Sequence, residues 1–138
     1  YLRFIAERWE KGSEYTWLVC LKPPNPNQEA LPIGAISLRL EGFRGNMGYV
    51  LAHKHWGKGY ATEMGRKIVD LAFADPAIVR VGAYCDIDNA ASARVMEKMG
   101  MSREGVLKSW LVHPAQGEQP RDCLSYAVTR REWQSGTL

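Results

Sequence analysis

A glycine-rich stretch, HWGKGYATE at residues 55–63, follows the short apolar run MGYVLA. A strand that leads through such a turn into a helix points several free backbone N–H groups at one spot, where the helix dipole adds partial positive charge. Such a spot binds phosphate, and Gly57 and Gly59 would let the backbone approach the anion without an intervening Cβ. Lys58 between them would add a charge contact. A tight turn without a ligand explains the same glycines, so the stretch alone leaves both interpretations open.

A second segment, DNAASARVMEKMGM at residues 88–101, predicts a helix that begins directly after a strand, with Asn89 as its N-cap. The strands that precede the two helices should form a parallel pair, so both helix N-termini would open on the same edge of the sheet. A crevice forms at such an edge. The chain has no GxxxxGK[ST] motif and no GxGxxG followed by an acidic residue, which excludes a Walker loop and a dinucleotide fingerprint.

These segments resemble the GNAT superfamily of N-acetyltransferases. The letters WGKGYA, residues 56–61, match the superfamily's pyrophosphate loop, [QR]-x-x-G-x-[GA], with Gly59 and Ala61 in the two small positions and Trp56 in place of Gln or Arg. Three features resemble motifs of the RimJ/RimL-type branch: this Trp, the segment DNAASARVMEKMGM and the closing segment RDCLSYAVTRREW. The branch includes enzymes that acetylate the N-terminal amine of ribosomal proteins. The resemblance covers about residues 4–133.

The resemblance implies an α/β fold of the GNAT type (α+β in its mixed sheet), in which helices flank a central mixed β-sheet. It also implies acetyl-CoA as the cofactor. The pyrophosphate would lie on the backbone amides of residues 57–62, and the pantetheine arm would pair with the preceding strand, where Gly48 would suit a bulge that splays this strand from the next. The residues implied to bind the cofactor are Tyr49, Val50, Leu51, Gly57, Lys58, Gly59, Tyr60, Ala61, Thr62, Asn89 and Ser92.

Acetyl transfer to an amine requires a hydrogen-bond donor for the developing oxyanion and a proton for the departing thiolate. The backbone N–H of Leu51 is the expected oxyanion donor. Ser92 matches a serine that RimL-type enzymes have been proposed to use as the acid, although a first-turn serine that assists the Asn89 cap is the structural alternative. Many relatives use a Tyr for this role at the position of Met96.

No residue is convincing as a general base. The acidic residue proposed for RimL-type enzymes falls near Leu111, and Asp86, Glu41 and His53 remain candidates only through a water molecule. The expected mechanism is therefore direct attack by an amine that loses its proton to solvent. An α-amine, with a pKa of about 8, needs less help from a base than a lysine-like amine with a pKa of about 10.4.

The acceptor is expected to be a primary amine, such as a peptide N-terminus, a polyamine or another small amine. Trp17, Tyr84 and Trp110 could line an acceptor pocket, but aromatic residues on strands usually belong to the core. His113 precedes the last strand, where family members often contact acceptors. The cations that could meet the 3′-phosphate of CoA, or simply be solvated, are Lys58, Arg94 and Lys98.

Two other functions are kept as alternatives. A module of GNAT fold could bind acyl-CoA as a sensor or scaffold without catalysis, and the glycine turn could bind the phosphate of a nucleotide unrelated to CoA. Loss of turnover with intact CoA binding after mutation of Ser92 would favour the enzyme, whereas a parent chain without turnover would favour the non-catalytic module.

The composition fits one domain, residues 1–138, with 46% hydrophobic and 24% charged residues. The apolar runs fall short of the roughly 20 residues that span a bilayer, and no signal peptide is evident, so a cytoplasmic protein without membrane contact is expected. The net charge of +3 is spread along the chain, which does not favour nucleic-acid binding. The three cysteines form no CxxC pair, which indicates neither disulfides nor a metal site.

Hydrophobic periodicity supplies the elements that must position these residues. A first helix is expected from Leu2, Ile5, Ala6 and Trp9, with Gly12 as its stop. Strands are expected at residues 15–21, 33–40, 47–52, 78–86, 105–112 and 123–129. A helix between the third and fourth of these strands would carry Ala61, Met64, Ile68, Leu71 and Ala72 on one face, and the helix opened by Asn89 would end at Gly100.

The resemblance implies that family members open with a strand and a helix before the segment that begins here, and this chain starts at Tyr1 without a Met. Either the sequence is truncated or the family's first strand is missing. Their absence would leave a sheet edge that something must cover. A second copy, in a homodimer, is one candidate.

Overall fold

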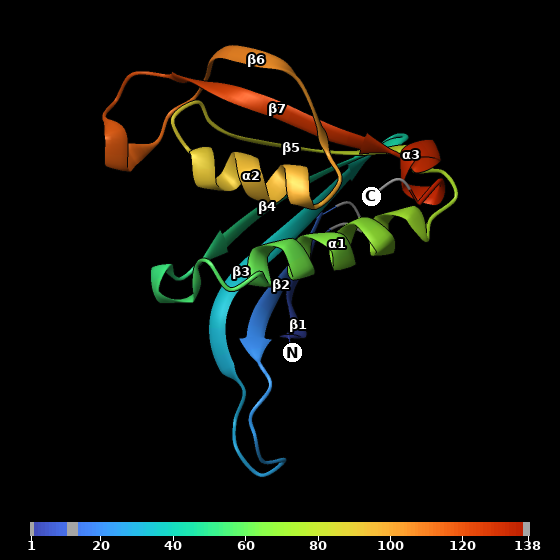
Figure 1. Ribbon diagram of the computed structural model, residues 1–138, viewed down its shortest axis with the longest axis vertical. Helices are drawn as coiled ribbons and strands as arrows, with labels where there is room; N and C mark the ends of the chain where they lie inside the picture. The colour runs from blue at the N-terminus through green and yellow to red at the C-terminus, as the bar shows by residue number, and fades with distance from the viewer. Residues whose placement is uncertain (1, 11–13, 137–138) are drawn as a thin grey trace.

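The structure is a computed structural model that describes residues 2–10 and 14–136. The strands form one seven-stranded sheet in the order β1-β2-β3-β4-β5-β7-β6 (Figure 1). They are β1 (Leu2–Glu10), β2 (Glu14–Leu21), β3 (Leu31–Glu41), β4 (Arg44–Leu51), β5 (Arg80–Asp86), β6 (Ser102–Leu111) and β7 (Arg121–Thr129). The helices are α1 (Tyr60–Phe73), α2 (Ala90–Lys98) and α3 (Arg130–Gln134), with short 3₁₀ turns η1 (His53–His55) and η2 (Pro114–Gln116).

The sheet is mixed. β4 and β5 run parallel, whereas the other neighbouring pairs are antiparallel. A parallel pair requires a crossover connection, and α1 provides it. α1 packs against β3 and β4, while α2 packs against β5 and β6 (Figure 1). The expected mixed sheet with flanking helices is confirmed.

The helix expected at the start of the chain is wrong, because Leu2–Glu10 is strand β1 and pairs antiparallel with β2. The expected stop at Gly12 lies outside the described residues. Four apolar residues at helical spacing are a weak local signal, whereas the outer edge of β2 offers a row of backbone donors and acceptors that a second strand satisfies. The sheet therefore has a strand beside β2 that the sequence did not predict, and β2 leaves no open edge for a second copy to cover.

The core lies between the sheet and helices α1 and α2, with Met64, Ile68 and Ala72 of α1 all buried as expected. Leu71 is 50% exposed, so its predicted place on the buried face is wrong. The buried face is rotated toward Gly65, where an added Cβ would overlap the side chain of Met99. This glycine lets the end of α2 approach α1 closely.

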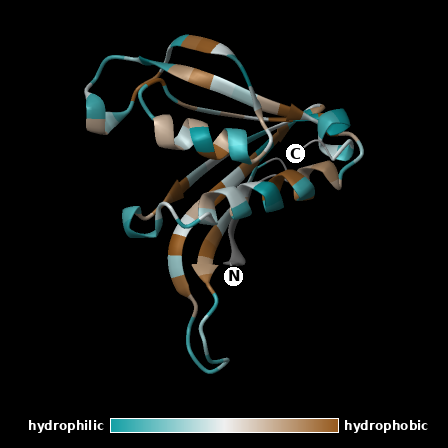
Figure 2. Cartoon of the chain, in the orientation of Figure 1, coloured by the Kyte–Doolittle hydropathy of each residue, from teal (hydrophilic) through white to brown (hydrophobic). Residues whose placement is uncertain are grey.

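The connection from β2 to β3, residues 22–30, forms a surface loop at the far end of this hairpin (Figures 1 and 2). Figure 2 shows apolar residues along β2 and β3 and polar residues at the loop tip. The three cysteines are all buried thiols. Among residues 2–10 and 14–136, no helix is both long enough and apolar enough to cross a membrane.

Candidate functional site

A gap opens between β4 and β5 because their parallel pairing ends at Asn46, opposite Gly82. β4 continues to Leu51 in unbroken register with β3, and Figure 1 shows it running away from β5. The predicted bulge at Gly48 is therefore wrong. The strands separate because β4 stays with β3 while β5 stays with β7.

The end of β4 presents open backbone groups to this gap. The N–H of Ala52 donates to the carbonyl of Ile33 at 2.8 Å. Because hydrogen-bonded pairs alternate along an antiparallel ladder, the backbone groups of Val50 face β3, and those of Tyr49 and Leu51 face the gap. Such an open strand edge can pair with an extended ligand.

The side chain of Trp56 forms a hydrogen bond with one of these open backbone groups, the carbonyl of Leu51. Its indole Nε1 donates to the carbonyl of Leu51 at 2.7 Å, and its ring lies 4.6 Å, between centroids, from the ring of His53. The Leu51 N–H is left facing the gap. The sequence marked Trp56 as a departure from the superfamily loop, but it gave no sign of this contact with β4.

The glycine turn then leads into α1 with both glycines in the left-handed region, at φ 74° for Gly57 and 83° for Gly59. Gly59 is the N-cap of α1 and offers no side-chain cap. The first N–H groups of this helix are therefore open, and they carry the positive end of its dipole. A Cβ at either glycine would meet no atom within 4 Å, so there is free space above the turn. The turn therefore combines free space, open N–H donors and a positive partial charge, which together suit a phosphate.

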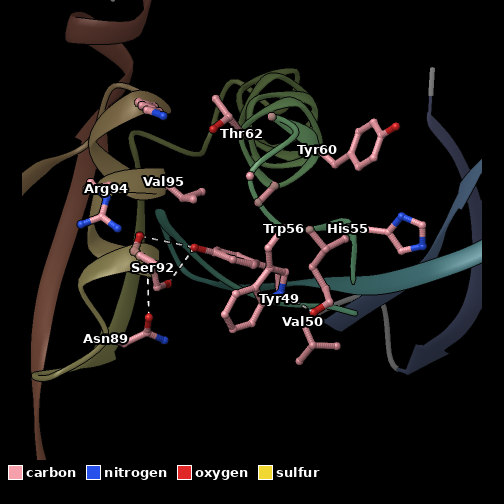
Figure 3. A pocket seen from close by; sticks show the side chains of 16 residues that line it. Tyr49, Val50, His55, Trp56, Tyr60, Thr62, Asn89, Ser92, Arg94 and Val95 are labelled. Carbon is pink, nitrogen blue, oxygen red and sulfur yellow. Dashed lines mark hydrogen bonds between the residues drawn. The ribbon is translucent and has the colours of Figure 1, made fainter. Parts of the chain in front are cut away.

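A cavity of about 420 Å³ unites these features (Figure 3). Every residue that the sequence assigned to the cofactor lines it except Lys58: Tyr49, Val50, Leu51, Gly57, Gly59, Tyr60, Ala61, Thr62, Asn89 and Ser92. The sequence also suggested Arg94 and Lys98, which line it. It did not suggest the four remaining lining residues, His55, Trp56, Ala91 and Val95.

The start of α2 brings Ser92 to the cavity. The side chain of Asn89 accepts from the N–H of Ser92 at 3.1 Å, which confirms the predicted N-cap. The cap is thus complete without the Ser92 hydroxyl, whose Oγ lies 2.7 Å from the hydroxyl of Tyr49. In Figure 3 the two side chains point toward one another from α2 and β4. Burial raises the pKa of the Tyr49 phenol, a shift that the bond to Ser92 opposes and Cys85 reinforces.

The three candidate bases lie elsewhere. Asp86 receives two hydrogen bonds from Arg121, at 2.6 and 3.0 Å, which hold its pKa at about 2. Glu41 lies at the end of β3 beside Arg44, at the opposite end of β4 from Leu51. None of the described residues that line the cavity is Asp or Glu, and His53 does not line it.

His55 is the titratable group that the sequence missed. Its side chain is buried, and neither ring nitrogen has a hydrogen-bond partner among the described residues. Burial lowers its pKa, and the charges of Lys58 and Lys54 lower it further, so the ring is neutral near pH 7. Figure 3 shows this ring turned away from Ser92 and Tyr49.

The opposite face of the sheet carries the exposed aromatic pair. Val50 is 67% exposed and follows Tyr49, so it points away from α2. Tyr84 alternates in β5 with buried Ala83 and Cys85, and its ring meets the exposed Trp110 edge-on at 5.9 Å between centroids. These two rings are not core residues, whereas Trp17 is buried in the core.

His113 lies beside the same end of the sheet. Its Nε2 is 3.9 Å from Oδ1 of Asp86. Arg121, which bonds to Asp86, also donates to Asp88 at 2.7 Å. The acidic side chains near His113 are therefore engaged with Arg121.

The sequence profile of the Acetyltransferase (GNAT) domain matches residues 1–102. The uncharacterized N-acetyltransferase YoaA of Bacillus subtilis is 34% identical over 98 residues, which cover 71% of this chain and 54% of YoaA. Among solved structures, an acetyltransferase (GNAT family) from Bacillus anthracis superposes with a TM-score of 0.70 at 30% identity, covering 84% of this chain and 66% of that one. Mycobacterium smegmatis RimJ in complex with CoA-disulfide superposes with a TM-score of 0.73 at 24% identity, covering 88% and 55%. The chain spans about half the length of the curated relatives it matches.

Proposed function

The chain belongs to the acetyltransferase (GNAT) domain family, and from this we propose that it transfers an acetyl group from acetyl-CoA to a primary amine. Residues 1–138 would form one domain, and the amine would attack acetyl-CoA directly while both are bound in a ternary complex. One observation carries it: the open edge of β4, the uncapped start of α1 and the Ser92 hydroxyl meet in a single cavity.

The cavity fits acetyl-CoA by its shape and its donors. The open N–H groups at the start of α1, with Gly57 and Gly59 beneath free space, would hold the pyrophosphate. Tyr49 would pair with the pantetheine arm through its open backbone groups, and Leu51, whose carbonyl is bonded to Trp56, would offer its N–H to the acetyl carbonyl. Val50 would contact the ligand only through its position at the rim, because its backbone groups are bonded to β3. The RimJ structure that superposes on this chain holds CoA-disulfide, which supports the same class of cofactor.

Cations at the rim suit the remaining phosphates. Arg94 and Lys98 of α2 line the cavity, and Lys98 also lines an adjoining groove with Arg66 and Lys67. We propose that this cluster, which includes the Arg94 and Lys98 that the sequence suggested, binds the 3′-phosphate. Lys58, the third cation that the sequence suggested, does not line the cavity.

Within the site, each catalytic role belongs to a group of this chain. When bound, acetyl-CoA supplies the activated acetyl group. The N–H of Leu51 faces the gap and would donate to the developing oxyanion. The hydroxyl of Ser92 would hold the proton that the departing sulfur takes.

The acceptor is proposed to be an α-amine, such as a peptide N-terminus. No described residue that lines the cavity is Asp or Glu, so the amine must arrive neutral. At pH 7.4 about a fifth of an amine with a pKa of about 8 is neutral, against about a thousandth of one with a pKa of about 10.4. Trp56 supports placement in the RimJ/RimL-type branch, whose members include enzymes with such acceptors.

The acceptor would approach from the face of Val50, Tyr84 and Trp110, through the gap between β4 and β5. These exposed apolar groups suit the side chain next to the amine. The outer edge of β1 would be the place for a second copy to pair, if the protein is a homodimer in the cytoplasm.

The test is calorimetric titration with acetyl-CoA, followed by mass spectrometry of a panel of peptides and small amines. We expect binding of acetyl-CoA in preference to ATP and NAD, and transfer to at least one α-amine. Binding without transfer to any amine would favour the non-catalytic acyl-CoA module instead. Equal binding of ATP and acetyl-CoA would favour a general nucleotide site.

A further inference from the structure

A hydrogen bond between two hydroxyls bridges the mouth of the β4–β5 gap. It joins Tyr49 of β4 to Ser92 of α2 at 2.7 Å, and both residues line the cavity (Figure 3). The backbone N–H of Ser92 is already bonded to Asn89, so the serine side chain is not part of the helix cap. The bond therefore needs an explanation other than capping.

The direction of this bond follows from acidity. A phenol is a far stronger acid than an aliphatic hydroxyl, so Tyr49 is the better donor of the two. Burial raises the pKa of Tyr49, so the phenol keeps its proton at neutral pH. Its other acceptor, the carbonyl of Ser92, is 3.5 Å away and competes weakly. A serine oxygen that accepts from Tyr49 still has its own proton to donate.

We propose that Tyr49 is a positioning residue that accounts for the acid role of Ser92: Tyr49 Oη donates to Ser92 Oγ and so directs the Ser92 proton into the cavity. This inference rests on the proposed acetyl transfer. As the carbon–sulfur bond breaks, the Ser92 proton moves to the sulfur and the Tyr49 proton moves to Ser92 Oγ. Tyr49 then regains a proton from solvent, which balances the proton that the attacking amine releases to solvent.

A competing explanation is that the bond only ties α2 to the sheet, and the chain provides a matched control for it. The hydroxyl of Tyr126 on β7 donates to Glu97 of α2 at 3.0 Å, so it also ties a strand to this helix. Tyr126 does not line the cavity. Tyr49→Phe and Tyr126→Phe each remove one strand-to-α2 hydroxyl contact and leave the ring in place.

The experiment measures kcat, the KM for acetyl-CoA and Tm in the parent, Y49F, Y126F, S92A and the Y49F/S92A double variant. We expect Y49F to lower kcat by about 10- to 100-fold with little change in KM, and the double variant to match S92A. Y126F is expected to have the kcat of the parent and a lower Tm. Non-additivity of Y49F and S92A identifies one unit.

A readout that does not depend on turnover is the titration of Tyr49, followed by the ¹³Cζ resonance that Y49F removes. When Tyr49 ionises, the Ser92 hydroxyl can turn and donate to the phenolate oxygen, which lowers the pKa of Tyr49 against the effect of burial, so S92A should move this titration to higher pH. An unchanged titration in S92A, or a Y49F enzyme with parental kcat, would overturn the inference while leaving the proposed function intact. A parent chain that binds acetyl-CoA and acetylates nothing would overturn both.

Discussion

The clearest single substitution is Gly59→Ala, because the chain contains a matched partner for it. Gly59 and Gly42 both have positive φ, at 83° and 59°, and a Cβ at either would meet nothing within 4 Å. Gly59 is the N-cap of α1 and lines the cavity, whereas Gly42 lies in the β3–β4 turn at the other end of β4. G59A and G42A should therefore have similar stabilities and should differ in their affinity for the ligand of the site.

The magnitudes separate folding from binding. An L-residue in the left-handed region costs about 1–2 kcal/mol, so G59A and G42A should lower the free energy of unfolding by similar amounts. At Gly59 the methyl group would also fill the space that an anion needs. Losing one hydrogen bond to a charged group costs about 1.5–3 kcal/mol, which raises Kd by about 10- to 150-fold.

The assay is calorimetric titration of the parent, G59A and G42A with CoA, beside thermal unfolding of all three. We expect both variants to lose a few degrees of Tm and only G59A to lose affinity. Parental affinity in G59A would refute the phosphate role of this turn. An equal loss of affinity in G42A would show that the effect is general destabilisation.

Three further outcomes test other parts of the structure. Gly34→Ala should destabilise the fold by about 1–3 kcal/mol, measured by urea unfolding, because its Cβ would overlap the carbonyl oxygen of Val50 in the paired strand; unchanged stability would contradict the close β3–β4 approach. Trp56→Phe removes the indole N–H that bonds to Leu51, so we expect about a fivefold weaker Kd for CoA, and an unchanged Kd would show that this bond does not shape the site. The Asp86 carboxyl has its pKa lowered from 3.8 to about 2 by Arg121, so its contribution to stability is complete above about pH 4 and is lost as the pH falls through 2; Tm measured against pH should show this loss in the parent and not in Asp86→Asn.

The position of the cavity was predictable because its two halves are marked by local signals. A glycine turn after one strand and an Asn cap after another are short-range features, and parallel strands bring them to the same edge. Asn89 caps α2 as expected, and the cavity forms where both helices begin. The resemblance to a known family then added the cofactor and the expected role of Ser92, which stays a prediction.

The features that sequence analysis missed depend on contacts between distant residues. The first strand forms by pairing with β2, and its apolar spacing pointed to a helix instead. The Tyr49–Ser92 bond joins residues 43 positions apart and depends on how β4 diverges from β5 beneath α2. The sequence left Asp86 as a candidate base because it does not show the hydrogen bond from Arg121, which lies 35 positions away along the chain.

The most direct test of acetyl transfer is to incubate the chain with acetyl-CoA and two copies of one short peptide, one with a free N-terminus and one with a blocked N-terminus. Both peptides carry an internal lysine, and mass spectrometry locates the added group. The account predicts acetylation at the free α-amine and none on the blocked peptide. Acetylation of the lysine in both peptides would contradict the proposed acceptor, and binding of acetyl-CoA with no transfer to any of a panel of α-amines would contradict the proposed activity.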